Sequence, residues 1–135
     1  MFVRNPWARA VSLYEHRKMH KDIDAALSFS DWLKVQRVGI EECEDRFRGP
    51  FEFRAFAYGE EEQNLADRVI RLEDIDKELP GLLEELRVPC PSPIPRFNAT
   101  VHDDYVKYYD TASRLWVAER FEFEIELFRY RFDGQ

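Results

Sequence analysis

Two short segments with the character of strands, each followed at once by a helical pattern, constrain the fold of this chain more than any other feature. Met1–Val3 has the character of a buried strand end. Asn5-Pro6 then predicts a helix start, because asparagine caps helices and proline suits the first helical position. Asp67–Leu72 is the second predicted strand, since it contains the β-branched residues Val69 and Ile70, and Glu73-Asp74 begins another helical stretch. This order is typical of parallel sheets, so we expect an α/β layer fold that is rich in helix.

The spacing of apolar residues predicts four helices, over residues 6–20, 28–38, 75–87 and 111–128. Gly39 is expected to end the second helix, Pro80 to interrupt the third so that it restarts there, and Thr111 to cap the fourth. The buried stripe of the third helix is predicted to consist of Leu79, Leu82, Leu83 and Leu86.

The segments between these helices are predicted to be irregular. We expect short helices and loops over residues 40–66, a proline-rich loop over 88–101, and an extended tail in which Tyr130 and Phe132 alternate outward. The aromatic residues of the last helix are expected to pack in the core; they are Trp116, Phe121, Phe123 and Phe128. Two strands alone do not make a stable sheet, so the domain is expected to be incomplete at its N-terminal side.

Composition narrows the class of protein. A length of 135 residues with 44% hydrophobic residues fits one domain with one modest core. A net charge of −7 argues against a general binder of nucleic acid or of anionic membranes. No apolar run is long enough to span a membrane or to resemble a secretory signal. Cys43 and Cys90 form no disulfide framework and are expected to be buried thiols, so we expect a cytoplasmic location.

The positive charge of this acidic chain is concentrated at its N-terminus. Residues 1–21 contain five basic residues and one glutamate, a net charge of +4. Arg4 lies between a strand end and a helix start, where unpaired N–H groups favour anions. Asn5, Ala8 and Ser12 fall within about 60° of one another on that helix, and small Ala8 leaves space there. The Arg4 guanidinium and the Ser12 hydroxyl could therefore bind one tetrahedral anion.

A purely structural explanation of the same residues stays open. Arg4 could form a salt bridge, Ser12 could bond back to its own helix, and the basic residues could line a solvated helix face. His16 and His20 are spaced i, i+4, as two ligands of one metal would be, and Asp22 and Asp24 follow them. No cysteine and no H-E-x-x-H pattern accompanies the pair, so a solvated helix face is expected and no metal is predicted.

Val3–Tyr14 resembles the 3′-phosphate-binding segment of sulfotransferases that use 3′-phosphoadenosine-5′-phosphosulfate (PAPS). The shared features are an arginine at a strand end, a proline, a second arginine, and a serine followed by a tyrosine. Other segments agree in order, and the likeness is closest to the carbohydrate-type enzymes. Phe29–Leu33 resembles the family's T-F-x-x-F-L helix, and Arg71–Ile75 resembles its R-x-E-x-L strand end. Asn98–Thr100 resembles its N-x-S/T segment. Tyr108–Asp110 resembles the start of its closing helix, and Phe128–Tyr130 resembles its F-G-Y segment.

The resemblance implies a P-loop-NTPase-like three-layer fold, present here as one partial domain over residues 1–135. It implies transfer of a sulfuryl group from PAPS to a hydroxyl of a carbohydrate-type acceptor, without a metal. Arg4 and Ser12 would hold the 3′-phosphate of the PAPS co-substrate, and Arg96 would reach the same phosphate from the loop before the last helix.

The chain also departs from the family. Its five glycines form no cradle for the 5′-phosphosulfate, and the family's catalytic Glu or His belongs to the missing upstream part. No catalytic residue is therefore predicted, and the isolated chain is expected to show no turnover. The alternative is a non-catalytic α/β remnant that binds a partner or a second copy through its sheet edge, with Phe2 and the aromatic stripe of the last helix near the contact.

Overall fold

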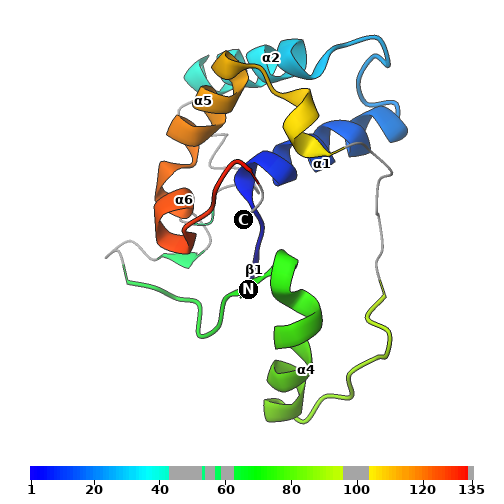
Figure 1. Ribbon diagram of the computed structural model, residues 1–135, viewed down its shortest axis with the longest axis vertical. Helices are drawn as coiled ribbons and strands as arrows, with labels where there is room; N and C mark the ends of the chain where they lie inside the picture. Colours follow the sequence, from blue (N-terminus) through cyan, green and yellow to red (C-terminus); the bar gives the residue numbers. More distant parts are fainter. Residues whose placement is uncertain (43–52, 54–56, 59–62, 96–103, 134–135) are drawn as a thin grey trace.

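The computed structural model describes residues 1–42, 53, 57–58, 63–95 and 104–133, with side chains omitted for 36–42. Within these ranges the chain is rich in helix (Figure 1). The strands are β1 (Phe2–Val3) and β2 (Ile70–Arg71). The α-helices are α1 (Pro6–Met19), α2 (Phe29–Glu42), α4 (Ile75–Glu85), α5 (Thr111–Arg120) and α6 (Glu122–Phe128). Two 3-10 turns are η1 (Leu72–Asp74) and η2 (Tyr105–Tyr108).

The two strands form a parallel pair, as the order of strand, turn and helix predicts. Phe2 lies opposite Ile70 and Val3 opposite Arg71. Hydrogen bonds extend the pairing, because the Met1 amino group donates to the Arg68 carbonyl over 2.8 Å. The predicted α/β character is therefore confirmed in its coarse form, with a two-stranded parallel sheet beside a set of helices.

Helix α1 begins where the sequence predicts. Asn5 is its N-cap, and its side-chain oxygen accepts from the backbone N–H groups of Trp7 and Ala8 over 3.1 and 3.4 Å. One face of α1 lies in the main core, where it packs against α2, α5 and η2. The buried residues of that core are Trp7, Val11, Tyr14, Phe29, Trp32, Leu33, Val117 and Tyr130. A smaller cluster holds Val3, Phe53 and Ala57, with α6 residues against it.

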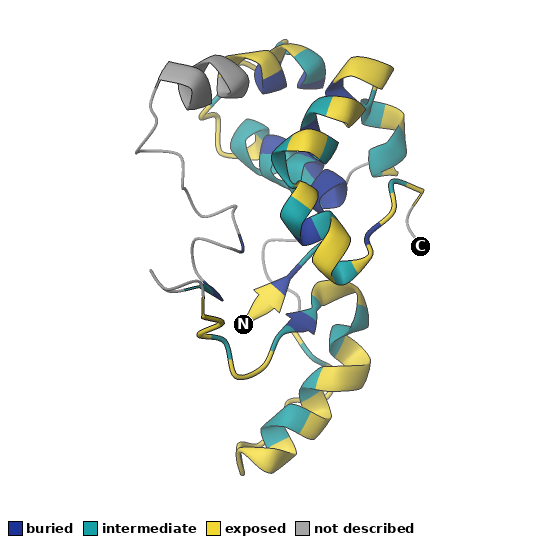
Figure 2. Ribbon diagram, turned by 90° about the vertical axis from the view of Figure 1, so that its left-hand side faces the viewer, coloured by how far each residue is buried: buried dark blue, intermediate teal, exposed yellow. Residues whose placement is uncertain are grey.

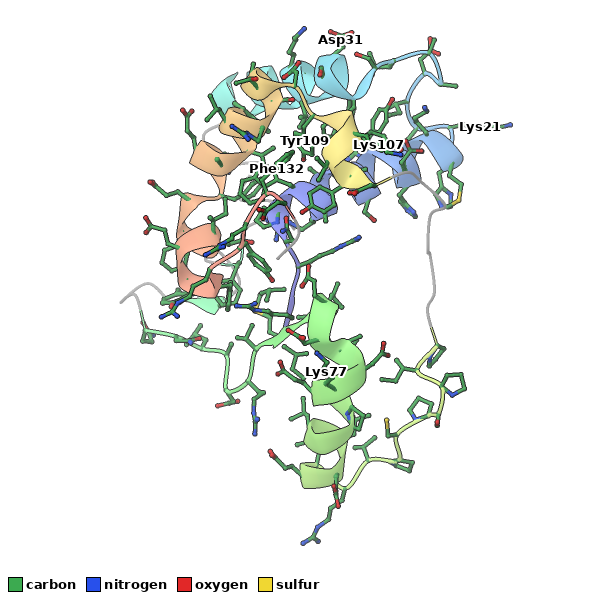
Figure 3. The ribbon with its side chains drawn as sticks, viewed as in Figure 1. Lys21, Asp31, Lys77, Lys107, Tyr109 and Phe132 are labelled. Carbon is green, nitrogen blue, oxygen red and sulfur yellow. The ribbon has the colours of Figure 1, made fainter. Side chains whose placement is uncertain are left out.

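Aromatic side chains close the core around the start of α1. Tyr109 and Phe132 lie near each other (Figure 3), and their rings pack edge to face with centroids 5.3 Å apart. The Tyr109 hydroxyl donates to the Trp7 carbonyl over 2.9 Å. The prediction that Tyr130 and Phe132 alternate outward is wrong, because Tyr130 is buried and Phe132 is half-buried against Trp7. The predicted core role of the last helix agrees with the half-buried aromatic residues of α5 and α6.

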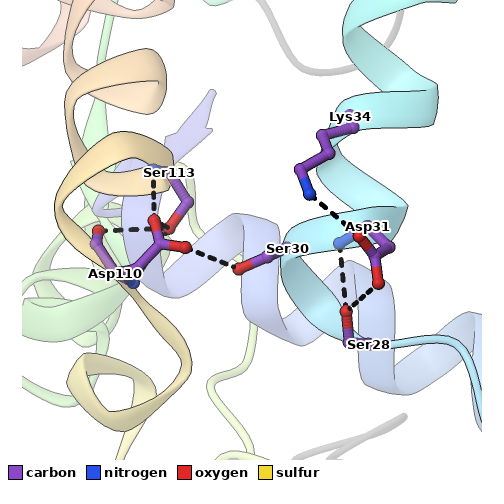
Figure 4. Close-up of polar contacts among 6 residues, drawn as sticks. All are labelled: Ser28, Ser30, Asp31, Lys34, Asp110 and Ser113. Carbon is purple, nitrogen blue, oxygen red and sulfur yellow. Dashed lines mark hydrogen bonds and ion pairs between the residues drawn. The ribbon is translucent and has the colours of Figure 1, made fainter.

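Several helix ends differ from the predictions. Helix α2 continues through Gly39 to Glu42. The final helix divides at Phe121 into α5 and α6. Its cap is Asp110 rather than Thr111, because the Asp110 carboxylate accepts from the Ser113 backbone N–H over 2.7 Å (Figure 4). That bond lowers the pKa of the Asp110 carboxyl group.

Helix α4 shows the largest departure. It runs through Pro80 without a restart, and none of its residues is buried. The predicted buried stripe is therefore wrong: Leu79, Leu82 and Leu83 are half-exposed, and Leu86 is 62% exposed. Figure 2 shows this helix apart from the buried residues of the main helices, and its chief contacts are with β2 and η1.

Cys90 is exposed, so its prediction as a buried thiol is wrong, and Cys43 lies outside the described residues. Residues 88–95 form an irregular, largely exposed segment, while most of 40–66 and the rest of the proline-rich loop lie outside the description. In the part of the chain that is described, no helix is long and apolar enough to cross a membrane.

Candidate anion site at the strand ends

Arg4 lies directly after β1, at the carboxyl end of the parallel pair. Its side chain is half-buried, and it forms no hydrogen bond or ion pair with another residue in the described ranges. Burial lowers the pKa of the Arg4 guanidinium; the Glu73 carboxylate acts to raise it and the Arg9 guanidinium to lower it. Arg4 is therefore a partly desolvated cation whose charge is only partly balanced by the described residues.

Glu73 reaches the same place from β2. Because the two strands are parallel, their carboxyl ends meet at one edge of the sheet. There the Asn5 backbone N–H donates to Glu73 Oε1 over 2.7 Å, a bond that joins residues 68 positions apart. Reasoning from sequence did not assign Glu73 to the site. The available signal was its place directly after the strand predicted over 67–72, as Arg4 directly follows the strand predicted over 1–3.

The start of α1 contributes less to an anion site than the sequence predicts. Pro6 has no N–H, the N–H groups of Trp7 and Ala8 bond to the Asn5 side chain, and Arg9 N–H bonds to the Asn5 carbonyl over 2.9 Å. The prediction of unpaired N–H groups is therefore wrong. The space expected above Ala8 is also covered, because Ala8 is 8% exposed. An anion would have to be bound mainly by side chains.

Ser12 lies in the second turn of α1 and is half-buried. Its hydroxyl has no hydrogen bond to another described residue, so the alternative of a bond back to its own helix is not seen. Neither the Ser12 hydroxyl nor the Arg4 guanidinium thus has a hydrogen-bond partner among the residues that the structure describes. Arg96, the third predicted contact, lies outside the described residues, as does Asn98–Thr100.

Arg9 is the second arginine of the N-terminal segment, and it is already paired. Arg9 Nη1 lies 2.8 Å from Glu124 Oε2, and the Arg9 guanidinium stands 4.8 Å from the centre of the Phe121 ring. Glu124 is 2% exposed and also accepts from the Phe53 backbone N–H over 2.7 Å. This buried pair connects α1 to α6. Of the two arginines Arg4 and Arg9, only Arg9 has an ion-pair partner among the described residues.

Arg71 and Tyr130 lie close to the same charged groups. Arg71 Nη2 donates to the Phe128 carbonyl, and the Arg71 guanidinium stands 5.2 Å from the centre of the Tyr130 ring. Burial raises the pKa of the Tyr130 hydroxyl, which is buried and has no hydrogen-bond partner among the described residues. These contacts fix the end of α6 against β2 and support the edge on which Arg4 and Glu73 lie.

The two histidines of α1 lie at its opposite end, with ring centroids 4.3 Å apart. Within the described ranges, no third His, Cys, Asp or Glu joins this pair to form a possible metal site. No other group of three such residues in these ranges could hold a metal ion.

Comparison with protein-family models, curated proteins and solved structures finds no match. A functional assignment therefore depends on the residues of the Arg4–Ser12 segment and on the contacts around them.

Proposed function

We propose that this chain binds the 3′-phosphate of PAPS or of adenosine 3′,5′-bisphosphate through Arg4 and Ser12. The observation that carries the proposal is the half-buried Arg4 guanidinium at a parallel strand end, without a hydrogen bond or ion pair to another described residue. A partly buried cation without a partner is costly, and a phosphate supplies paired oxygens that match a guanidinium. Ser12 adds, on the same segment, a hydroxyl that bonds to no other described residue.

Two further features support a sulfotransferase-type chain with the P-loop-NTPase-like fold. Arg129 adopts a φ of 55°, the left-handed conformation that a small residue takes most easily, at the position where the family's F-G-Y segment has glycine. The apolar positions of Phe29–Leu33, which resembles the family's T-F-x-x-F-L helix, are all buried: Phe29, Trp32 and Leu33.

In the proposed reaction the sulfuryl group of PAPS passes to a hydroxyl of a carbohydrate-type acceptor. The acceptor oxygen attacks sulfur, the bond from sulfur to the 5′-phosphate oxygen breaks, and the acceptor proton goes to a base. Arg4 and Ser12 hold the nucleotide and take no part in these bond changes. Since neither a base nor a 5′-phosphosulfate cradle is identified in this chain, we expect nucleotide binding by the isolated chain without turnover.

Titration calorimetry with adenosine 3′,5′-bisphosphate tests the binding. Arg4→Ala is expected to weaken it by about 10- to 150-fold, since a charge-assisted hydrogen-bonded contact contributes about 1.5–3 kcal/mol. Arg17→Ala is the matched control, because it removes the same charge from the other end of α1. Equal affinities of the wild type and Arg4→Ala would remove Arg4 from the site.

A second candidate function is self-association, which the partly exposed apolar face of α4 favours. Ile75, Leu79, Leu82 and Leu86 follow one another at intervals of four, three and four residues, the spacing of helices that pair. This face replaces the aromatic stripe of the last helix as the expected contact, since those aromatic residues pack in the core. Phe2, which is 48% exposed on β1, remains available at the sheet edge.

Light scattering at micromolar concentration tests this second function, and the wild type is expected to be at least dimeric. A Leu79→Glu/Leu86→Glu variant is expected to be monomeric, because charge on the apolar face opposes its burial. Leu115→Glu serves as the control, since Leu115 is a 49% exposed leucine of α5 away from this face. A monomeric wild type would contradict the proposal.

A further inference from the structure

Glu73 holds its carboxylate at the site proposed for the 3′-phosphate. It accepts a 2.7 Å hydrogen bond from the Asn5 backbone N–H, immediately beside Arg4 in the chain. It also acts electrostatically on the Arg4 guanidinium without forming an ion pair within 4.0 Å. Glu73 itself is exposed, so solvent reaches the residue on its open side.

We propose that Glu73 is a specificity-determining residue, whose carboxylate excludes small free anions from Arg4 and admits only a nucleotide with further contacts. This inference depends on the proposed function, because it concerns the same Arg4 site. The chemical class excluded is the simple tetrahedral oxyanion, with inorganic phosphate as its representative.

Three physical effects give Glu73 this role. First, its negative charge offsets part of the attraction between Arg4 and an anion. Second, a phosphate on Arg4 would approach the Glu73 carboxylate, and like charges at short range repel each other. Third, the Asn5 N–H is already occupied by Glu73 and cannot donate to a phosphate until Glu73 moves. A nucleotide can offset these costs with contacts to its base and sugar, whereas free phosphate cannot.

The test compares two substitutions that remove one negative charge each from adjacent residues. Glu73→Gln keeps a side-chain oxygen that can accept from Asn5 N–H, so the strand end is expected to fold unchanged. Asp74→Asn is the matched control, because the Asp74 carboxylate lies 3.4 Å from Lys77 Nζ on the next turn. Both variants and the wild type are titrated with adenosine 3′,5′-bisphosphate and, separately, with inorganic phosphate.

Glu73→Gln is expected to bind adenosine 3′,5′-bisphosphate about tenfold more tightly than the wild type, and to bind inorganic phosphate measurably where the wild type does not. Asp74→Asn is expected to change either affinity by less than about twofold, since the half-buried Asp74 carboxylate pairs with Lys77 and forms no hydrogen bond or ion pair with Arg4 or Asn5. If the wild type binds the nucleotide and Glu73→Gln binds it no more tightly, the role of Glu73 is overturned while the nucleotide site stands. If neither protein binds it, the proposed function and this inference both fail.

Discussion

Glu124→Ala is expected to destabilise the protein by about 3–5 kcal/mol, because it breaks a buried ion pair by removing one partner. The substitution leaves the Arg9 guanidinium, whose side chain is 19% exposed, without its carboxylate. It also leaves the Phe53 backbone N–H without the acceptor that now lies 2.7 Å away. Urea unfolding of the two proteins measures the loss as a lower midpoint with a similar slope.

Two controls separate this buried pair from a general effect of charge on α6. Glu126→Ala removes an exposed carboxylate two residues away and is expected to change stability by less than about 0.5 kcal/mol. The double variant Arg9→Met/Glu124→Leu is expected to recover much of the loss, because it removes both buried charges together. If Glu124→Ala proved as stable as Glu126→Ala, the pair would contribute nothing to the fold.

Trp32→Ala is expected to cost about 3–5 kcal/mol, the range for removing a large aromatic side chain from a core. Trp32 is 2% exposed and packs against the rings of Tyr14 and Phe29, at centroid distances of 5.6 and 6.0 Å. The loss would leave a cavity where α2 packs on α1. Chemical denaturation followed by circular dichroism measures the change.

The same helix supplies the comparison for Trp32. Val35→Ala is expected to stay within about 0.5 kcal/mol of the wild type, because Val35 is 61% exposed. Trp32→Phe is expected to cost less than Trp32→Ala, since it keeps most of the apolar volume and removes an indole N–H that has no partner among the described residues. Equal losses for Trp32→Ala and Val35→Ala would place the core elsewhere.

The parts of the fold predicted well from sequence are those controlled by local signals. Asn5-Pro6 starts α1, and both of its effects, the cap and the fixed proline backbone, act within one turn. The Ser28 hydroxyl likewise accepts from Asp31 N–H over 3.1 Å at the start of α2. The parallel pairing followed from two strands that each precede a helix.

The errors arise where tertiary packing decides. Gly39 and Pro80 lie inside helices that continue past them. A residue of low helix propensity lowers the stability of a helix at its own position and does not by itself end the helix. The division at Phe121 turns α6, so that Glu124 meets Arg9 across 115 residues of sequence. No local spacing contains that contact. The exposed stripe of α4 has the spacing of a buried one, since periodicity reports an apolar face and not what covers it.

The candidate site likewise contains residues that local sequence predicts and one that it does not. Arg4 and Ser12 could be chosen from neighbouring sequence because both belong to one strand, turn and helix. Glu73 could not be chosen in that way, because its bond to Asn5 spans 68 residues. The sequence predicts that the N–H groups at the start of α1 are available to a ligand. In the structure the Asn5 side chain accepts hydrogen bonds from the Trp7 and Ala8 N–H groups, as an N-cap residue ordinarily does.

The parallel pairing of β1 with β2 also has a consequence for the order in which the protein folds. The contact of Phe2 with Ile70 closes a loop that contains α1 and α2, whereas the turns of those helices form from contacts a few residues apart. Loop closure consumes chain entropy before the strand hydrogen bonds repay it, so long-range parallel pairs form slowly and late. We therefore expect the edge that carries Arg4 and Glu73 to be among the last parts of the molecule to assemble, so that a ligand bound there would act on the final step of folding.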